Sequence, residues 1–129
     1  MYKKIFSPGF SDTDALGHIN NTVFPYWFEN SRIEIFRIFS RELDLNNWPL
    51  ILAKITIDFK HQCYYGVEVE VNSYIDKVGN SSFVVLQEVF QKNKLVAVGM
   101  STMVHFDHKK NISIQIPLEI KKQLLIHQK

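Results

Sequence analysis

The sequence predicts an α+β fold in which one long helix is wrapped by a curved antiparallel sheet of about five strands. Three observations lead to this prediction. One segment near the start has the apolar spacing of a helix with a single buried face. Four later segments alternate apolar and polar residues, as strands with one covered face do. Short turns separate these four segments, so neighbouring strands are expected to run in opposite directions.

The first element expected is a strand over residues 2–10, with Pro8 and Gly9 near its end. A polar loop over 11–21 follows. A helix is expected from about Thr22 to about Ser40, with Thr22 as N-cap and Pro25 in the first turn, where a missing N–H does no harm. Its apolar stripe consists of Phe24, Trp27, Phe28, Ser31, Ile35, Ile38 and Phe39, and its polar side of Glu29, Asn30, Arg32, Glu34 and Arg37.

Four strands are expected after a polar connection at 42–48. The first spans 49–62, with one face formed by Ile51, Ala53, Ile55, Ile57 and Phe59. The others span 67–76, 82–91 and 95–106, with turns at 64–66, at 79–80 and about 92–94. The tail over 112–129 contains Pro117 and the pattern of a short helix. No linker or repeat divides the chain, which indicates one domain over 1–129.

Composition narrows the class of protein. The net charge of +2 and the absence of a long basic run argue against a nucleic-acid partner. Cys63 is the only cysteine, so no internal disulfide is possible and a reducing, cytoplasmic location is expected. No apolar stretch approaches the roughly 20 residues that span a bilayer, so no membrane insertion is expected. His105, Asp107 and His108 converge poorly for a metal, and neither metal nor cofactor is expected.

The segment 11–21 is the candidate for chemistry. It places two carboxylates, a histidine, two carboxamides and a glycine directly before the expected helix. Asp12 and Asp14 also suit Asx turns, and Asn20 and Asn21 also suit a helix cap. His18 can serve as a packing residue, and Gly17 can supply an unusual backbone conformation. The residue types alone leave both interpretations open.

Together, the motif Asp12-x-Asp14-x-x-Gly17-His18-x-Asn20-Asn21 and the aromatic-rich helix after it resemble the hotdog-fold acyl-CoA thioesterases, in the 4-hydroxybenzoyl-CoA thioesterase-like branch. The resemblance covers roughly residues 3 to 107. It implies a homodimer with two sheets joined edge to edge, often assembled further into a homotetramer, and active sites that draw on both chains. By position, Asp14 matches the family's catalytic carboxylate. Asn21 stands where some relatives have an assisting histidine, and His18, Asn20 and Asn21 match another common version of the motif.

Thioester chemistry agrees with this resemblance. A CoA thiol has a pKa near the ordinary thiol value of about 8.5, so it departs as thiolate without a strong general acid. Asp14 could act as general base on a water or as nucleophile on the carbonyl. Backbone N–H groups at the helix start near 21–23 could stabilise the oxyanion. The positive groups considered for the CoA phosphates are Lys54, Lys60, His61, Lys77 and Lys92.

The leading expectation is therefore an acyl-CoA thioesterase that releases free acid and CoA. The alternative is a non-catalytic hotdog protein that binds acyl-CoA or acyl carrier protein, suggested by Asn21 in place of histidine. A hydratase of acyl thioesters is a third possibility, but the motif that such enzymes use later in the fold is absent. Acyl chain length, and CoA against acyl carrier protein, stay open at this stage.

Overall fold

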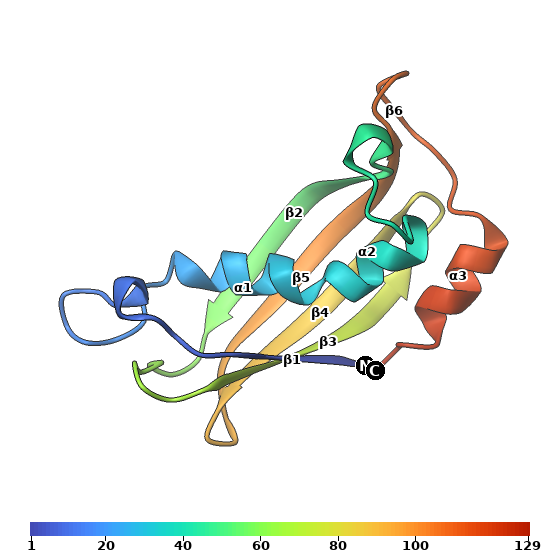
Figure 1. Cartoon of the computed structure of the whole chain (residues 1–129). Helices are drawn as coiled ribbons and strands as arrows, with labels where there is room; N and C mark the ends of the chain where they lie inside the picture. Colours follow the sequence, from blue (N-terminus) through green and yellow to red (C-terminus); the bar gives the residue numbers. More distant parts are fainter.

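The computed structural model describes all residues from 1 to 129. Its sheet has the strand order β1-β3-β4-β5-β2, and all neighbouring pairs are antiparallel. The strands are β1 (Tyr2–Phe6), β2 (Leu50–Phe59), β3 (Val69–Val78), β4 (Ser82–Gln91) and β5 (Lys94–Asp107), and a short β6 (Ile112–Ser113) pairs with β5. Two consecutive helices lie across one curved face of the sheet, and a third helix near the C-terminus lies to the side of them (Figure 1). The predicted curved antiparallel sheet of five strands is confirmed.

The helix differs from the prediction. The structure has two helices, α1 (Val23–Ser31) and α2 (Ile33–Phe39), where one helix was expected over 22–40. At the break, the Arg32 N–H donates to the Glu29 carbonyl at 3.0 Å, a bond to the third residue back that tightens the turn. The two helices still follow one another across the sheet (Figure 1).

The Arg32 side chain leaves the expected polar face and enters the core, where it is 3% exposed. Its Nη1 donates to Gln87 Oε1 at 3.2 Å and to Ser101 Oγ at 2.9 Å. Gln87 in turn donates to the Phe28 carbonyl and to Ser73 Oγ, both at 2.9 Å. The expectation that Arg32 belongs to the solvent face was therefore wrong. This polar network separates two apolar clusters, one under α1 and one under α2.

The first strand after the helices is interrupted by a bulge. The pairing of β2 with β5 skips one residue between Leu52 and Lys54. Because a bulge shifts the side-chain alternation by one position, Leu50 and Ile55 both reach the core, while Ile51 is exposed. The single face predicted for the odd-numbered residues from Ile51 to Phe59 is therefore divided at Ala53.

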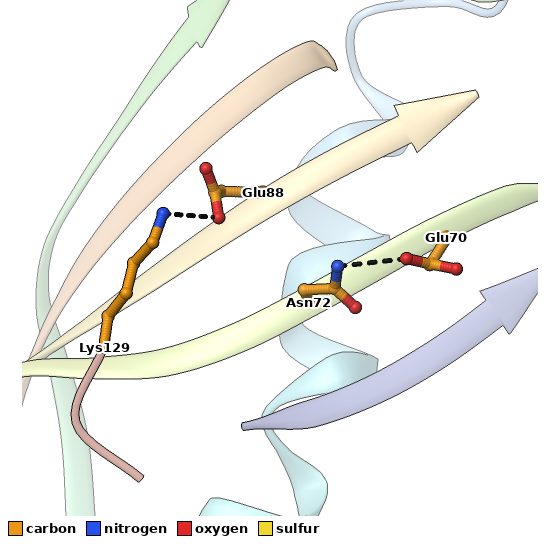
Figure 2. A network of polar contacts seen from close by, with 4 residues as sticks. All are labelled: Glu70, Asn72, Glu88 and Lys129. Atoms are coloured by element: carbon orange, nitrogen blue, oxygen red, sulfur yellow. Dashed lines mark hydrogen bonds and ion pairs between the residues drawn. The ribbon is translucent and has the colours of Figure 1, made fainter. Parts of the chain in front are cut away.

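The tail forms α3 (Leu118–Leu125), as predicted. His127 Nε2 lies 3.0 Å from Tyr2 Oη, so the last residues meet the first strand, and the termini lie side by side (Figure 1). Lys129 Nζ donates to Glu88 Oε1 at 2.9 Å, and Figure 2 shows this pair beside the Asn72–Glu70 hydrogen bond. None of the helices has the length and apolar character needed to cross a membrane.

Candidate active site

The loop before α1 is folded back on itself. The Asp14 N–H donates to the His18 carbonyl at 2.7 Å, and the Asn20 N–H donates to the Asp12 carbonyl at 2.8 Å. Gly17 lies at the tip with φ of +80°, a left-handed conformation that glycine adopts without a steric penalty. The predicted role of Gly17 is confirmed. These contacts hold the acidic part of the loop in one place.

Asp14 combines a held carboxylate oxygen with a free one. Its Oδ1 accepts the backbone N–H of Leu16 at 2.7 Å and that of His18 at 3.1 Å, which completes an Asx turn. Its Oδ2 has no hydrogen-bond partner within the protein. The turn expected from the residue type is present, and it leaves one oxygen available to a water or a substrate.

A hollow of about 550 Å³ opens beside this carboxylate, at the start of α1 and the end of β2. It is lined by Asp14, Ile19, Asn21, Phe24, Phe59, Lys60, His61, Gln62 and Cys63. We call it the Asp14 hollow. Aromatic rings form part of its wall, since Phe24 and Phe59 pack edge to face with centroids 5.2 Å apart. An apolar wall next to a carboxylate suits a substrate with an apolar acyl group and a polar reacting bond.

The structure separates the other candidates in the loop. Asn21 is exposed and lines the Asp14 hollow, and its backbone N–H makes no hydrogen bond within the protein. Asn20 Oδ1 accepts both the N–H and the hydroxyl of Thr22, at 3.0 and 2.9 Å. The side-chain oxygen that accepts an N–H at the start of α1 therefore belongs to Asn20. The Thr22 side chain forms no capping hydrogen bond, so its predicted capping role was wrong.

The other polar candidates of the loop, His18 and Asp12, lie outside the hollow. The His18 ring packs edge-on against Tyr64, with centroids 5.3 Å apart, and does not line the Asp14 hollow. Asp12 Oδ2 accepts the Gly9 N–H at 2.8 Å, which shapes the turn before the loop. Of the sequence-based candidates, the hollow brings together Asp14 and Asn21 and leaves Asn20 and His18 in supporting positions.

Sequence reasoning considered Lys60 and His61 for the CoA phosphates but did not predict that the segment 59–63 forms a wall of the site. The Ile19 N–H donates to the Cys63 carbonyl at 2.8 Å, which ties this segment to the loop. The Lys60 N–H donates to the Val96 carbonyl at 2.8 Å, which ties it to β5. The polar run at the end of the strand was visible in the sequence, but its position against residue 19 depends on long-range pairing.

Cys63 lines the Asp14 hollow without a reactive thiol, and His105 and His108, at the end of β5 and just after it, lie outside the hollow. Cys63 is 3% exposed, and burial raises the pKa of its thiol to about 11, so it stays protonated at neutral pH. His105 lies 3.2 Å from the Gln115 carbonyl and His108 lies 2.9 Å from the Leu50 carbonyl, so their rings have separate partners. The structure holds no group of three side chains suited to a metal ion.

A second, more apolar hollow of about 410 Å³ lies at the opposite end of β2. We call it the apolar hollow. Its lining is mostly hydrophobic and comes from the helices, the connection after them and β2. The residues are Glu29, Asn30, Arg32, Ile33, Phe36, Leu43, Leu45, Trp48, Leu50, Ile51, Leu52 and Met103. Within one chain it is separate from the Asp14 hollow, because the two share no lining residue.

Comparison with known proteins agrees with this fold and site. The family model of the thioesterase-like superfamily matches residues 8–124. A predicted thioesterase from Bacillus stearothermophilus is 34% identical, with a TM-score of 0.96 and coverage of 99% of this chain and 96% of that one. A thioesterase from Thermus thermophilus, solved with coenzyme A and Zn, is 25% identical, with a TM-score of 0.85 and coverage of 95% and 96%. No protein of curated function matches the chain.

A 1,4-dihydroxy-2-naphthoyl-CoA thioesterase from Synechocystis shares the fold at 19% identity, with a TM-score of 0.79 and coverage of 97% and 95%. The helices across a curved antiparallel sheet form the hotdog fold that these thioesterases share. The chain belongs to the thioesterase-like superfamily, and the protein is a thioester hydrolase.

Proposed function

We propose that this thioester hydrolase cleaves acyl-CoA to free acid and CoA, and that Asp14 is the catalytic carboxylate. One observation carries the proposal: Asp14 lines a hollow at the start of α1 with one oxygen held by two N–H groups and the other unpartnered. The coenzyme A bound in the Thermus thermophilus relative supports CoA as the leaving group.

The chemistry follows from these groups. Oδ2 of Asp14 either removes a proton from a water that attacks the thioester carbonyl, or attacks the carbonyl itself to give a mixed anhydride that water then cleaves. We propose that the N–H of Asn21, which has no partner within the protein and lies at the positive end of α1, donates to the carbonyl oxygen as negative charge develops there. The C–S bond breaks and the electron pair leaves on sulfur as CoA thiolate.

The proposed assembly completes the site across two copies of the chain. The edge strand β2 has a neighbour on one side only, and it exposes Ile51, Leu52 and Phe59. A ten-residue edge with exposed apolar residues is a template for pairing with a second strand. Antiparallel pairing of β2 with its copy about a two-fold axis brings the apolar hollow of one chain beside the Asp14 hollow of the other. The acyl group would then lie in the partner's apolar hollow. A homotetramer built from such homodimers stays a prediction.

Asp14→Asn tests the catalytic role. The amide keeps the size of the side chain but is neither a base nor a nucleophile, so we expect the release of thiol from acyl-CoA to fall by about 100-fold or more. The measurement is thiol release across a panel of acyl-CoAs, with Asp12→Asn as the matched control. Equal activity in wild type and Asp14→Asn would remove Asp14 from the mechanism.

The non-catalytic alternative has its own outcome in the same experiment. If the wild-type protein binds acyl-CoA but releases no thiol for any acyl group in the panel, the chain is a binding protein. Asn21, which lines the Asp14 hollow where some relatives have histidine, is the observation that keeps this alternative in view.

A further inference from the structure

A third hollow, of about 470 Å³, adjoins the Asp14 hollow and is rich in positive charge. The two hollows share His61 and Gln62 on their rims. We call the third one the cationic hollow. It is lined by His61, Gln62, Tyr64, Val67, Gln91, Lys92, Lys94 and Val96, with no carboxylate among them. A hollow that combines positive side chains with a floor of neutral residues suits a ligand that carries several negative charges.

The lysines around it are available to a ligand. Lys92 and Lys94 are exposed, as is Lys60 on the rim of the Asp14 hollow, and none of the three forms an ion pair. Lys92 also lines a separate hollow together with Glu68 and Glu70, but it forms an ion pair with neither. Because a paired lysine would have to give up its partner first, unpaired lysines bind an anion at lower cost.

The turn that carries Lys92 has an unusual backbone. Lys92 and Asn93 have φ of +50° and +62° between β4 and β5, as the two central residues of a tight hairpin turn. Glycine and asparagine adopt this conformation readily, whereas lysine pays a small steric penalty. Positive φ at both central residues is what such a hairpin turn requires, and the turn sets Lys92 at the rim of the hollow.

His61 adds a further polar group in a defined tautomer. Its Nδ1 lies 2.9 Å from the Leu95 carbonyl, and a carbonyl only accepts, so Nδ1 carries the proton. Its Nε2 has no partner within the protein. Nε2 is therefore free to contact a ligand at the junction of the two hollows.

Gln91, which is 6% exposed, lies in the floor of the cationic hollow and holds the neighbouring backbone by hydrogen bonds. Its Oε1 accepts the Tyr64 N–H at 2.9 Å, and its Nε2 donates to the carbonyls of Tyr64 and Val67 at 2.9 and 3.1 Å. The same segment is tied to the Asp14 loop through the bond from Ile19 to Cys63. The cationic hollow and Asp14 are therefore parts of one connected framework.

We infer that the cationic hollow binds the 3′-phosphate and diphosphate of CoA, with Lys92 and Lys94 as the main ligands and Lys60 and His61 at the junction. This inference rests on the proposed function and identifies the carrier of the acyl group. The pantetheine arm of CoA is uncharged, and all the negative charge lies on the phosphates of the nucleotide. A carrier protein shares the phosphopantetheine arm but has no nucleotide to fill this hollow, so CoA is the favoured carrier.

The test compares Lys92→Asn/Lys94→Gln with Lys109→Gln/Lys110→Gln. Both double variants remove two positive charges, and asparagine keeps the left-handed conformation at 92. Residues 109 and 110 follow β5 at the end of the sheet opposite the 92–93 turn (Figure 1). The substrates are acyl-CoA, acyl-dephospho-CoA, acyl-pantetheine and acyl carrier protein, each with the same acyl group.

We expect the first double variant to raise KM for acyl-CoA by about tenfold or more, because charged hydrogen bonds are lost, and to leave kcat nearly unchanged. KM for acyl-pantetheine should stay the same in both variants, and the control should match wild type for all substrates. The effect on acyl-dephospho-CoA should be smaller than on acyl-CoA.

Calorimetric titration with CoA and with pantetheine separates this inference from the proposed function. Weaker CoA binding in the first double variant, with unchanged pantetheine binding, supports the cationic hollow even if no substrate is hydrolysed. Three results would overturn the inference: unchanged CoA affinity in that variant, an equal loss in the control, or a higher kcat/KM for acyl carrier protein than for acyl-CoA.

Discussion

Arg32 carries a positive charge into the core with neutral hydrogen-bond partners. Burial lowers the pKa of its guanidinium to about 10, so at neutral pH it is still charged. Its Nε is buried without a partner, and its Nη1 depends on the oxygens of Gln87 and Ser101. A buried charge is costly when its partners are removed, since it has no solvent to replace them.

A double-mutant cycle on Arg32 and Gln87 tests this coupling. Gln87→Met leaves the guanidinium with Ser101 and should lower the free energy of unfolding by about 3–5 kcal/mol. Arg32→Met leaves neutral acceptors unsatisfied and should cost about 1–3 kcal/mol. The double variant should cost less than the sum, as measured by urea unfolding. Additive losses would show that the two side chains act independently.

The sequence predicted part of this residue-scale picture. Asp12 and Asp14 as turn-forming residues, Asn20 as a polar group at the helix start and Gly17 with an unusual backbone conformation all follow from local preferences. The inward path of Arg32 could not be predicted from helical periodicity, because its partners lie 55 and 69 residues further along the chain. The register of the strands in the sheet decides which residues meet across that distance.

At the scale of elements, the approach of α1 to the sheet depends on Gly99 in β5. A Cβ added there would lie 2.8 Å from Cε2 of Phe28, a side chain that is fully buried. No real Cβ contact is that short, so α1 would have to shift away from β5. The glycine therefore sets how closely helix and sheet pack.

Gly99→Ala should lower the free energy of unfolding by about 1–3 kcal/mol through overpacking. Adding Phe28→Leu should recover part of the loss, because the smaller side chain makes room for the methyl group. Thermal or urea unfolding measures both, and Gly9→Ala, where the new Cβ would lie 3.6 Å from its nearest neighbour, is the control. A stable Gly99→Ala with no recovery by Phe28→Leu would contradict this account of the packing.

Element type and order were predictable from periodicity, whereas their interruptions were not. The strands and α3 follow from alternation and from Pro117. The break at Arg32 and the bulge at Ala53 come from contacts between layers and between strands, which leave no local pattern. The wall of the Asp14 hollow formed by residues 59–63 also leaves no local pattern, since its position depends on where β2 ends against the loop.

At the scale of the whole molecule, the proposed dimer can be tested by complementation. Asp14→Asn removes the carboxylate, and Ile33→Trp fills the apolar hollow. In a mixed dimer, one composite site has both defects and the other has neither. Random exchange of the two inactive variants should therefore restore about a quarter of wild-type thiol release, because half of the dimers regain one of two sites.

Mass determination by light scattering accompanies this measurement, with each variant alone as the control. If each site lay within one chain, the mixture would stay inactive, and a monomeric mass would remove the composite site altogether. The resemblance in the sequence predicted an interface site, and the proposal of which hollows form it rests on the ends of β2 at which they lie.

The meeting of the two termini has a consequence for the path of the backbone. Met1 and Tyr2 contact His127, and Gln128 pairs with Ile75 beside β1, so the chain ends where it began. The two ends of the backbone therefore lie close together on the β1 side of the sheet, opposite the free edge of β2. A short peptide bridge between residues 129 and 1 would circularise the chain without redirecting any strand, and would leave the Asp14 hollow and the β2 edge unobstructed.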